Sequence, residues 1–116
     1  MILQKYEDEL SNLIPEATDL IKADFNYKKD IAVEIKLAEE IKDKNYCNDI
    51  TLQIRLVGIL DKKYNIIEKT MDIDKILNQF RFSNNDWIVR ENVWYTSYVD
   101  EEKFNTVLMY KIRNYK

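Results

Sequence analysis

The sequence contains no histidine, one cysteine and one glycine among its 116 residues, and these shortages exclude several classes of function. Without histidine, a serine or cysteine nucleophile lacks its usual general base, and zinc and haem iron lack their usual ligands. Loops that cradle phosphate groups need several glycines. The single Cys47 cannot form an internal disulfide, and we interpret it as an incidental thiol. We therefore predict a non-enzymatic protein without a cofactor, a bound metal ion or a small-molecule substrate.

Long apolar runs are also missing, so we expect no transmembrane span. The N-terminal segment carries acids from Glu7 onward and lacks the apolar core of a signal peptide, which predicts a cytoplasmic protein. Charged residues make up 34% of the chain but leave a net charge of only −3. That balance argues against non-specific binding to nucleic acid or to an anionic membrane, because such binding depends on an excess of Lys and Arg.

With 116 residues, 46% of them hydrophobic, the chain has enough length for one compact core but not for two. Residues 1–116 are therefore expected to form a single domain. Apolar residues recur at helical intervals over residues 2–23, and Pro15 interrupts them at a cost of about 3 kcal/mol. We expect a kink there or two short helices, the second starting at Pro15. A second, short helix is predicted over residues 73–81, with Asp72 as its N-cap.

Alternation of apolar and polar residues predicts strands over residues 30–37 and 50–56. The first of these segments also fits the beginning of a helix that runs through Lys44. Residues 42–49, which include Cys47, are expected to form a charged loop. Gly58 indicates a bulge or a close approach of the backbone. Residues 64–71 are expected to return as the second arm of a hairpin.

A long hairpin over residues 86–115 organises the predicted fold. Its first arm, residues 87–98, is rich in the aromatic and β-branched residues that favour strands. A polar turn at residues 100–103 leads into the second arm. Alternation there places Phe104, Thr106, Leu108, Tyr110 and Ile112 on one face and Asn105, Lys111 and Arg113 on the other. Since glycine is scarce, we expect asparagine to supply the positive φ angles of tight turns, at Asn65, Asn84 and Asn85.

These elements predict an α+β fold. The N-terminal amphipathic helix, kinked at Pro15, and the short second helix pack on one face of an antiparallel sheet of about five strands. The β-α-β alternation of a doubly wound fold is missing.

The aromatic residues of the final hairpin fall on both faces of its strands, so they cannot all enter one core. In one interpretation, one set packs under the helices and the other set is ordinary surface tyrosine. In the other, Trp94 and Tyr98 belong to a protein interface, because Trp and Tyr are frequent in binding hot spots. A third interpretation is that the aromatic side chains stack on nucleic-acid bases, which the net negative charge disfavours.

Charge is divided unevenly along the chain. Residues 1–24 contain six acids and two lysines, whereas residues 103–116 contain four basic residues and no acid. An acidic helix and a basic strand allow head-to-tail pairing between copies, which closes into a ring when the rotation permits. Alternatively, both patches face water or each other within one monomer. The candidate interface residues are Glu7, Asp8, Glu9, Trp94, Tyr98, Lys111, Arg113 and Tyr115.

Acidic residues leave two chemical alternatives. Asp72 with Asp74, or the acids of the turn at residues 100–102, offer oxygen ligands for Mg²⁺ or Ca²⁺. We interpret them as helix and turn charges, because no calcium-loop spacing with its glycine is present. A carboxylate pair containing Glu34 would suit acid–base catalysis of the glycosidase type. With 21 acids in the chain, such a pair is not diagnostic.

In its order of elements the chain resembles the small tail-terminator and tail-completion proteins of long-tailed phages. The shared order is an amphipathic N-terminal helix, antiparallel strands, a short helix at 73–81, an acid-rich turn and a last strand that ends Val107-Leu108-Met109-Tyr110-Lys111-Ile112-Arg113. The family's usual long loop between the first strands is missing, and the break at Pro15 is unexpected.

This resemblance implies a non-enzymatic subunit that forms a homo-oligomeric ring at the head-proximal end of a tail. It would contact tail-tube and connector proteins and would reside in the virion. The alternative function is a small acidic inhibitor or immunity-type protein that blocks a partner enzyme with its acidic helix or an exposed sheet edge.

Overall fold

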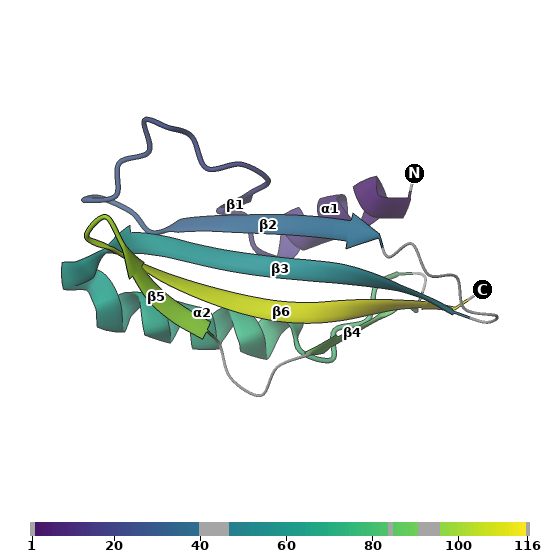
Figure 1. The fold of residues 1–116 in the computed structure, drawn as a ribbon. Coiled ribbons are helices and arrows are strands. Elements are labelled where there is room, and N and C mark those ends of the chain that lie inside the picture. Colours follow the sequence, from purple (N-terminus) through teal and green to yellow (C-terminus); the bar gives the residue numbers. More distant parts are fainter. Residues whose placement is uncertain (1, 40–46, 84, 91–95, 116) are drawn as a thin grey trace.

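The computed structural model describes residues 2–39, 47–83, 85–90 and 96–115. Within these ranges the chain forms two α-helices, one short 3-10 helix and six strands (Figure 1). In chain order the elements are α1 (Ile2–Leu13), β1 (Ala17–Thr18), β2 (Ala32–Glu39), β3 (Cys47–Ile59), η1 (Leu60–Lys62), α2 (Lys63–Leu77), β4 (Trp87–Arg90), β5 (Thr96–Asp100) and β6 (Lys103–Tyr115).

The six strands form one sheet in the order β1-β2-β3-β6-β4, and β5 also pairs with β6. Its centre is the antiparallel ribbon of β3 and β6, which are paired from Cys47 opposite Tyr115 to Ile59 opposite Lys103. Strand β2 runs antiparallel to β3, while β4 and β5 pair antiparallel with different halves of β6. The two-residue β1 runs parallel to β2. The predicted α+β class is confirmed, with six strands in place of about five.

One face of this sheet carries the hydrophobic core. Residues paired directly across strands point to the same side, so the register defines rows of neighbouring side chains. One such row is Ile35, Ile54 and Leu108, and all three are buried. The predicted buried face of β6 is confirmed, since Phe104, Thr106, Leu108, Tyr110 and Ile112 are all buried.

Both helices lie on this core face. Helix α2 buries Ile66, Thr70, Ile73 and Leu77, at helical spacing. The hydroxyl oxygens of Thr70 and Thr106 are 2.7 Å apart, which fixes α2 over β6. Helix α1 buries Tyr6 and Leu10, and Ile14, which follows the helix, is buried with them. Residues of α1 border a hollow that is also lined by Ile35 of the core face. Figure 1 shows α2 running along the length of β3 and β6, with α1 beside β2. Neither helix is long and apolar enough to cross a membrane.

Both predicted strands, over residues 30–37 and 50–56, are present, with different bounds. Residues 32–39 form a strand, not the start of a helix, and residues 50–56 lie within β3. Cys47 begins β3 and is not in a loop, which corrects one prediction. The rest of the expected loop before Cys47 lies outside the described residues.

The prediction of a helix over residues 2–23 is wrong beyond Leu13. Helix α1 ends there, and no second helix starts at Pro15. A residue before proline is disfavoured in the helical conformation, and proline has no N–H to donate. The chain turns instead, with the Ala17 amide donating to the Ile14 carbonyl over 3.0 Å. Ala17 and Thr18 then pair with β2.

The predicted hairpin arm at residues 64–71 is also wrong, because these residues lie in α2. The helix predicted over 73–81 is correct only in its first part, since α2 starts at Lys63 and ends at Leu77. Asp72 is therefore an exposed mid-helix residue and not an N-cap. Thr70 lies on the buried face of α2, but as a polar residue it does not add to the apolar pattern from which a helix is predicted.

The first arm of the predicted final hairpin is two strands, β4 and β5, which both pair with β6. The predicted polar turn at residues 100–103 is confirmed, and it has two residues between the ends of β5 and β6. Glu101 and Glu102 have φ angles of 49° and 64°, the combination that a type I′ hairpin turn needs. Among the described asparagines, Asn85 is the one with a positive φ, 71°. Asn65 lies inside α2 instead, and Asn84 lies outside the described residues.

The predicted close approach at Gly58 is confirmed, whereas a bulge is not, since Gly58 pairs regularly with Phe104. A Cβ atom at Gly58 would lie 2.7 Å from Cδ1 of Ile66, closer than side chains tolerate. Glycine here therefore lets α2 pack directly on β3.

Candidate functional site

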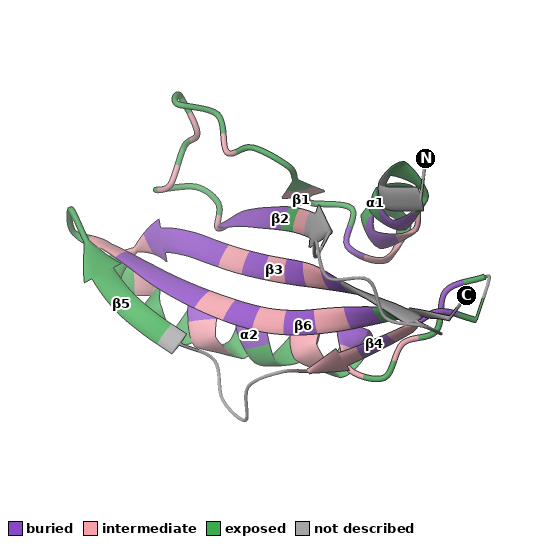
Figure 2. Cartoon of the chain, turned by 45° about the vertical axis from the view of Figure 1, so that its right-hand side comes forward, coloured by how far each residue is buried: buried purple, intermediate pink, exposed green. Residues whose placement is uncertain are grey.

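The second face of the sheet is not covered by either helix. We call it the open face and define it by side chains of β2 to β6 that point away from the helices: Glu34, Lys36, Arg55, Trp87, Val89, Tyr98, Val107, Met109, Lys111 and Arg113. Apart from Glu34, these residues are half-buried or exposed. Figure 2 shows the resulting alternation along β3 and β6, where buried residues alternate with intermediate ones.

The loop between β1 and β2 shields one end of this face. There the Tyr27 ring lies 4.5 Å from the Nζ atom of Lys103. Val57 and Asn105, which oppose each other in the β3–β6 pairing, are buried at the same end. This local cover accounts for buried Asn105, which the alternation had placed on the polar side of β6.

A polar cluster centres on Glu34, which is only 3% exposed. Its carboxylate accepts hydrogen bonds from Nε of Arg55 at 3.2 Å and Nη2 of Arg55 at 3.5 Å. Burial lowers the pKa of Arg55, but hydrogen bonds with Tyr98 and Glu34 outweigh that effect and hold the pKa above its usual value. Arg55 thus remains a cation that satisfies a buried carboxylate. Glu34 is therefore paired with a base and not with the second acid that glycosidase chemistry needs.

An apolar strip runs through the open face beside this cluster. Trp87 and Val89 of β4 and Val107 and Met109 of β6 are all half-buried. The Arg81 guanidinium lies 5.0 Å from the centre of the Trp87 ring, a cation–π contact. Lys111 and Arg113 follow Met109 on the same side of β6. In the pairing of β4 with β6, Val89 lies opposite Lys111 and Trp87 opposite Arg113. The open face thus has apolar and basic side chains side by side at this end.

The structure places three of the predicted interface residues on one face of the sheet but not beside one another, because Tyr98 pairs with Asn105 near the start of β6 while Lys111 and Arg113 lie near its end. Tyr98, Lys111 and Arg113 lie on the open face, and Tyr98 is 42% exposed. Tyr115 ends β6 opposite Cys47, and its side chain is outside the described part. Trp94 lies outside the described residues, so its predicted pairing with Tyr98 stays a prediction.

The predicted acidic residues lie on α1, on the other side of the sheet. Glu7 and Asp8 are exposed. Glu9 instead accepts hydrogen bonds from the Ser83 amide at 3.0 Å and the Ser83 hydroxyl at 3.3 Å. It ties α1 to the segment that precedes β4, so it has a structural role.

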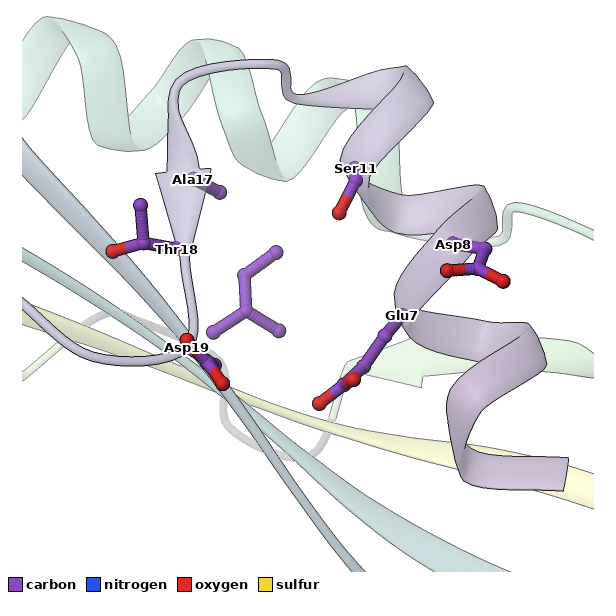
Figure 3. A pocket seen from close by; sticks show the side chains of 7 residues that line it. Glu7, Asp8, Ser11, Ala17, Thr18 and Asp19 are labelled. Carbon is purple, nitrogen blue, oxygen red and sulfur yellow. The ribbon is translucent and has the colours of Figure 1, made fainter. Parts of the chain in front are cut away.

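Glu7 and Asp8 border a hollow between α1 and β1 of about 280 Å³. Ser11, Ala17, Thr18, Asp19 and Ile35 complete its lining. Figure 3 shows the carboxylates of Glu7 and Asp19 entering this hollow from opposite sides. Among the described residues, the lining includes three acids and no base, so a cation is the complementary group. We call it the acidic hollow. Sequence reasoning did not single out Asp19, because only the parallel pairing of β1 brings that residue toward α1.

Two polar groups link the helices to the rest of the chain: a part-buried one at Asp74 of α2 and a buried one between Tyr6 of α1 and Asp86, which precedes β4. Asp74 of α2 accepts hydrogen bonds of 2.6 Å from both the Tyr110 hydroxyl and Nη1 of Arg90. Burial, reinforced by the bond to Asp74, raises the pKa of Tyr110. The Tyr6 hydroxyl donates to the buried carboxylate of Asp86. Asp74 is thus held by Arg90 and Tyr110, and among the described residues no group of three or more acids or cysteines is placed to bind a metal ion.

The chain matches no protein-family model, and no curated protein is significantly similar to it.

Proposed function

We propose that the protein is a non-catalytic assembly subunit and that the open face is its protein-binding surface. The observation that carries this proposal is the asymmetry of the sheet. Two helices cover one face, while the other presents Trp87, Tyr98 and Met109 beside arginine and lysine. Trp, Tyr, Met and Arg are the residues enriched at protein interfaces.

The chemistry of the open face favours binding over catalysis. Its buried carboxylate, Glu34, is already neutralised by Arg55. The strip of Val89, Val107 and Met109 has no polar group to act on a substrate, but it offers apolar area that a partner would remove from water.

Among assembly subunits, we propose a ring component at the end of a phage tail. The order of α1, an antiparallel pair β2–β3, α2 and strands ending in β6 supports this choice, because it follows the element order of the tail-terminator and tail-completion proteins. In this chain the second helix is α2 at residues 63–77, ahead of the 73–81 segment on which the resemblance was drawn.

Photo-cross-linking in producing cells tests the proposal. A photoreactive phenylalanine analogue is placed at Val107 on the open face or, as a control, at exposed Glu68 on α2. We expect adducts at position 107, either with further copies or with structural proteins of an assembled particle, and few at position 68. Adducts confined to an enzyme would favour the inhibitor reading. Equal adducts at both positions, or none at 107, would contradict the proposal.

A further inference from the structure

We propose that the partner of the open face is the acidic hollow of a second copy of this chain, so that copies associate head-to-tail. This inference rests on the proposed function and names the occupant of its binding surface. In the contact, Arg113 and Lys111 of one copy approach Glu7, Asp8 and Asp19 of the next.

The two charged surfaces lie on opposite sides of the sheet. Ile112 is buried on the core face, so its neighbours Lys111 and Arg113 point the other way. The acidic hollow lies on the core side, between α1 and β1, where Ile35 contributes to its lining. The sheet therefore separates the acids from the bases. The two patches of one monomer therefore face opposite sides of the sheet.

The hollow has room for a long basic side chain. Lys111 and Arg113 are two residues apart on one strand, which spaces them by about 7 Å along β6. The hollow, at about 280 Å³, has carboxylates on both sides, and the part of its lining that the structure describes contains no base. A long, exposed Arg113 side chain can enter it and meet acids from both walls.

The placement of the two charged surfaces on opposite sides of the sheet also determines the symmetry of the contact between copies. One partner cannot occupy both surfaces of a copy at once, because the sheet lies between them. The contact is therefore heterologous, and repeating it produces a closed ring or an open filament. Exposed ion pairs stabilise weakly, so the charges set orientation and rate of encounter, while the strip of Val89, Val107 and Met109 supplies the apolar contact.

Charge reversal with mixing tests this inference on the full chain. One variant carries Glu7→Lys and Asp8→Lys, and the other carries Lys111→Glu and Arg113→Glu. Glu68→Lys with Asp72→Lys is the matched control for the first variant, since it makes the same change of charge on exposed residues of α2. Sedimentation velocity over a wide concentration range, at low and high salt, reports the mass, and circular dichroism confirms folding. If the second variant does not fold, Arg113→Glu alone takes its place.

We expect the wild type to form an oligomer that weakens with salt and the control to form the same oligomer. Each reversal variant alone should be monomeric. An equimolar mixture should assemble again, because the basic helix of one variant then meets the acidic strand of the other. Native mass spectrometry should show equal numbers of both variants in these assemblies.

Three results would overturn the inference: a strictly monomeric wild type, equal loss of assembly in the control, or no recovery in the mixture. Other results would reject this inference and leave the proposed function standing. An oligomer that ignores charge reversal but dissociates on Val107→Glu would reject the acidic hollow and retain the open face. A monomer that cross-links from position 107 to other structural proteins would do the same.

Discussion

Val107 and Leu108 are neighbours on β6, yet their side chains lie on opposite faces of the sheet, one open and one covered by the helices. Leu108 points into the core under α2 and is buried, whereas Val107 points to the open face and is only half-buried. The same contrast extends across the sheet, because each core row of side chains has an open-face row beside it. The alternating pattern of a strand therefore identifies its two faces, while packing of the helices determines which face becomes the core.

The largest expected effect separates these two neighbours. Leu108→Ala should lower the free energy of unfolding by about 2–5 kcal/mol, because it leaves a cavity in the core. Val107→Ala should cost less than about 1 kcal/mol, since part of its side chain already contacts water. Urea unfolding of both variants measures the difference. Similar losses for the two would show that both faces are packed alike.

A smaller loss is expected where α2 approaches the sheet most closely. Gly58→Ala places a Cβ atom within 2.7 Å of Ile66 Cδ1, and such overpacking costs about 1–3 kcal/mol. Ile66→Val removes that Cδ1 atom, so the double variant should lose less stability than the sum of the single variants. Denaturant unfolding of the three proteins checks this cycle. Strict additivity would mean that the contact at Gly58 does not limit the packing of α2.

The bond between α2 and β6 at Tyr110 predicts a dependence on pH. Folding raises the pKa of Tyr110 above its unfolded value of 10.0, so above that pH the unfolded chain has released a proton that the folded chain keeps. Stability should therefore be fully present below pH 10.0 and should fall as the pH rises beyond it.

Tyr110→Phe should cost about 1 kcal/mol at neutral pH, because Asp74 loses one of its hydrogen bonds. Above pH 10.0 the variant should lose stability less steeply than the wild type. Thermal unfolding of both proteins across this range measures the two slopes. Parallel curves would show that Tyr110 titrates alike in the folded and unfolded chains.

Local patterns predicted much of this fold because they report local geometry. The alternation in β6 identified both of its faces, and the placement of Lys111 and Arg113 followed from parity alone. Residues 64–71 were assigned to a hairpin arm because the polar residues Asp61 to Lys63 follow the preceding strand like a turn. The contact of Thr70 with Thr106 belongs to the helical face, which the pattern of apolar residues does not include. Apolar residues beyond Pro15 extended a helical pattern that the proline ends.

The candidate site depended more on long-range pairing, which a single sequence does not contain. The Glu34–Arg55 ion pair requires the register between β2 and β3, which places these two residues opposite each other. The acidic hollow requires the parallel pairing of β1 with β2. Parity could have suggested the first of these, since both residues fall on the polar side of their strands; no sequence signal indicated the second.

The most direct test of the division between the two faces is the stability of one triple variant. Val89→Thr, Val107→Thr and Met109→Gln together remove the apolar strip of the open face while keeping the sizes of the side chains similar. If this face serves binding, the triple variant should lose less than about 2 kcal/mol in urea unfolding, below the loss expected for Leu108→Ala alone. A loss clearly larger than that of Leu108→Ala would contradict the account, because it would show that the strip is part of the folded core.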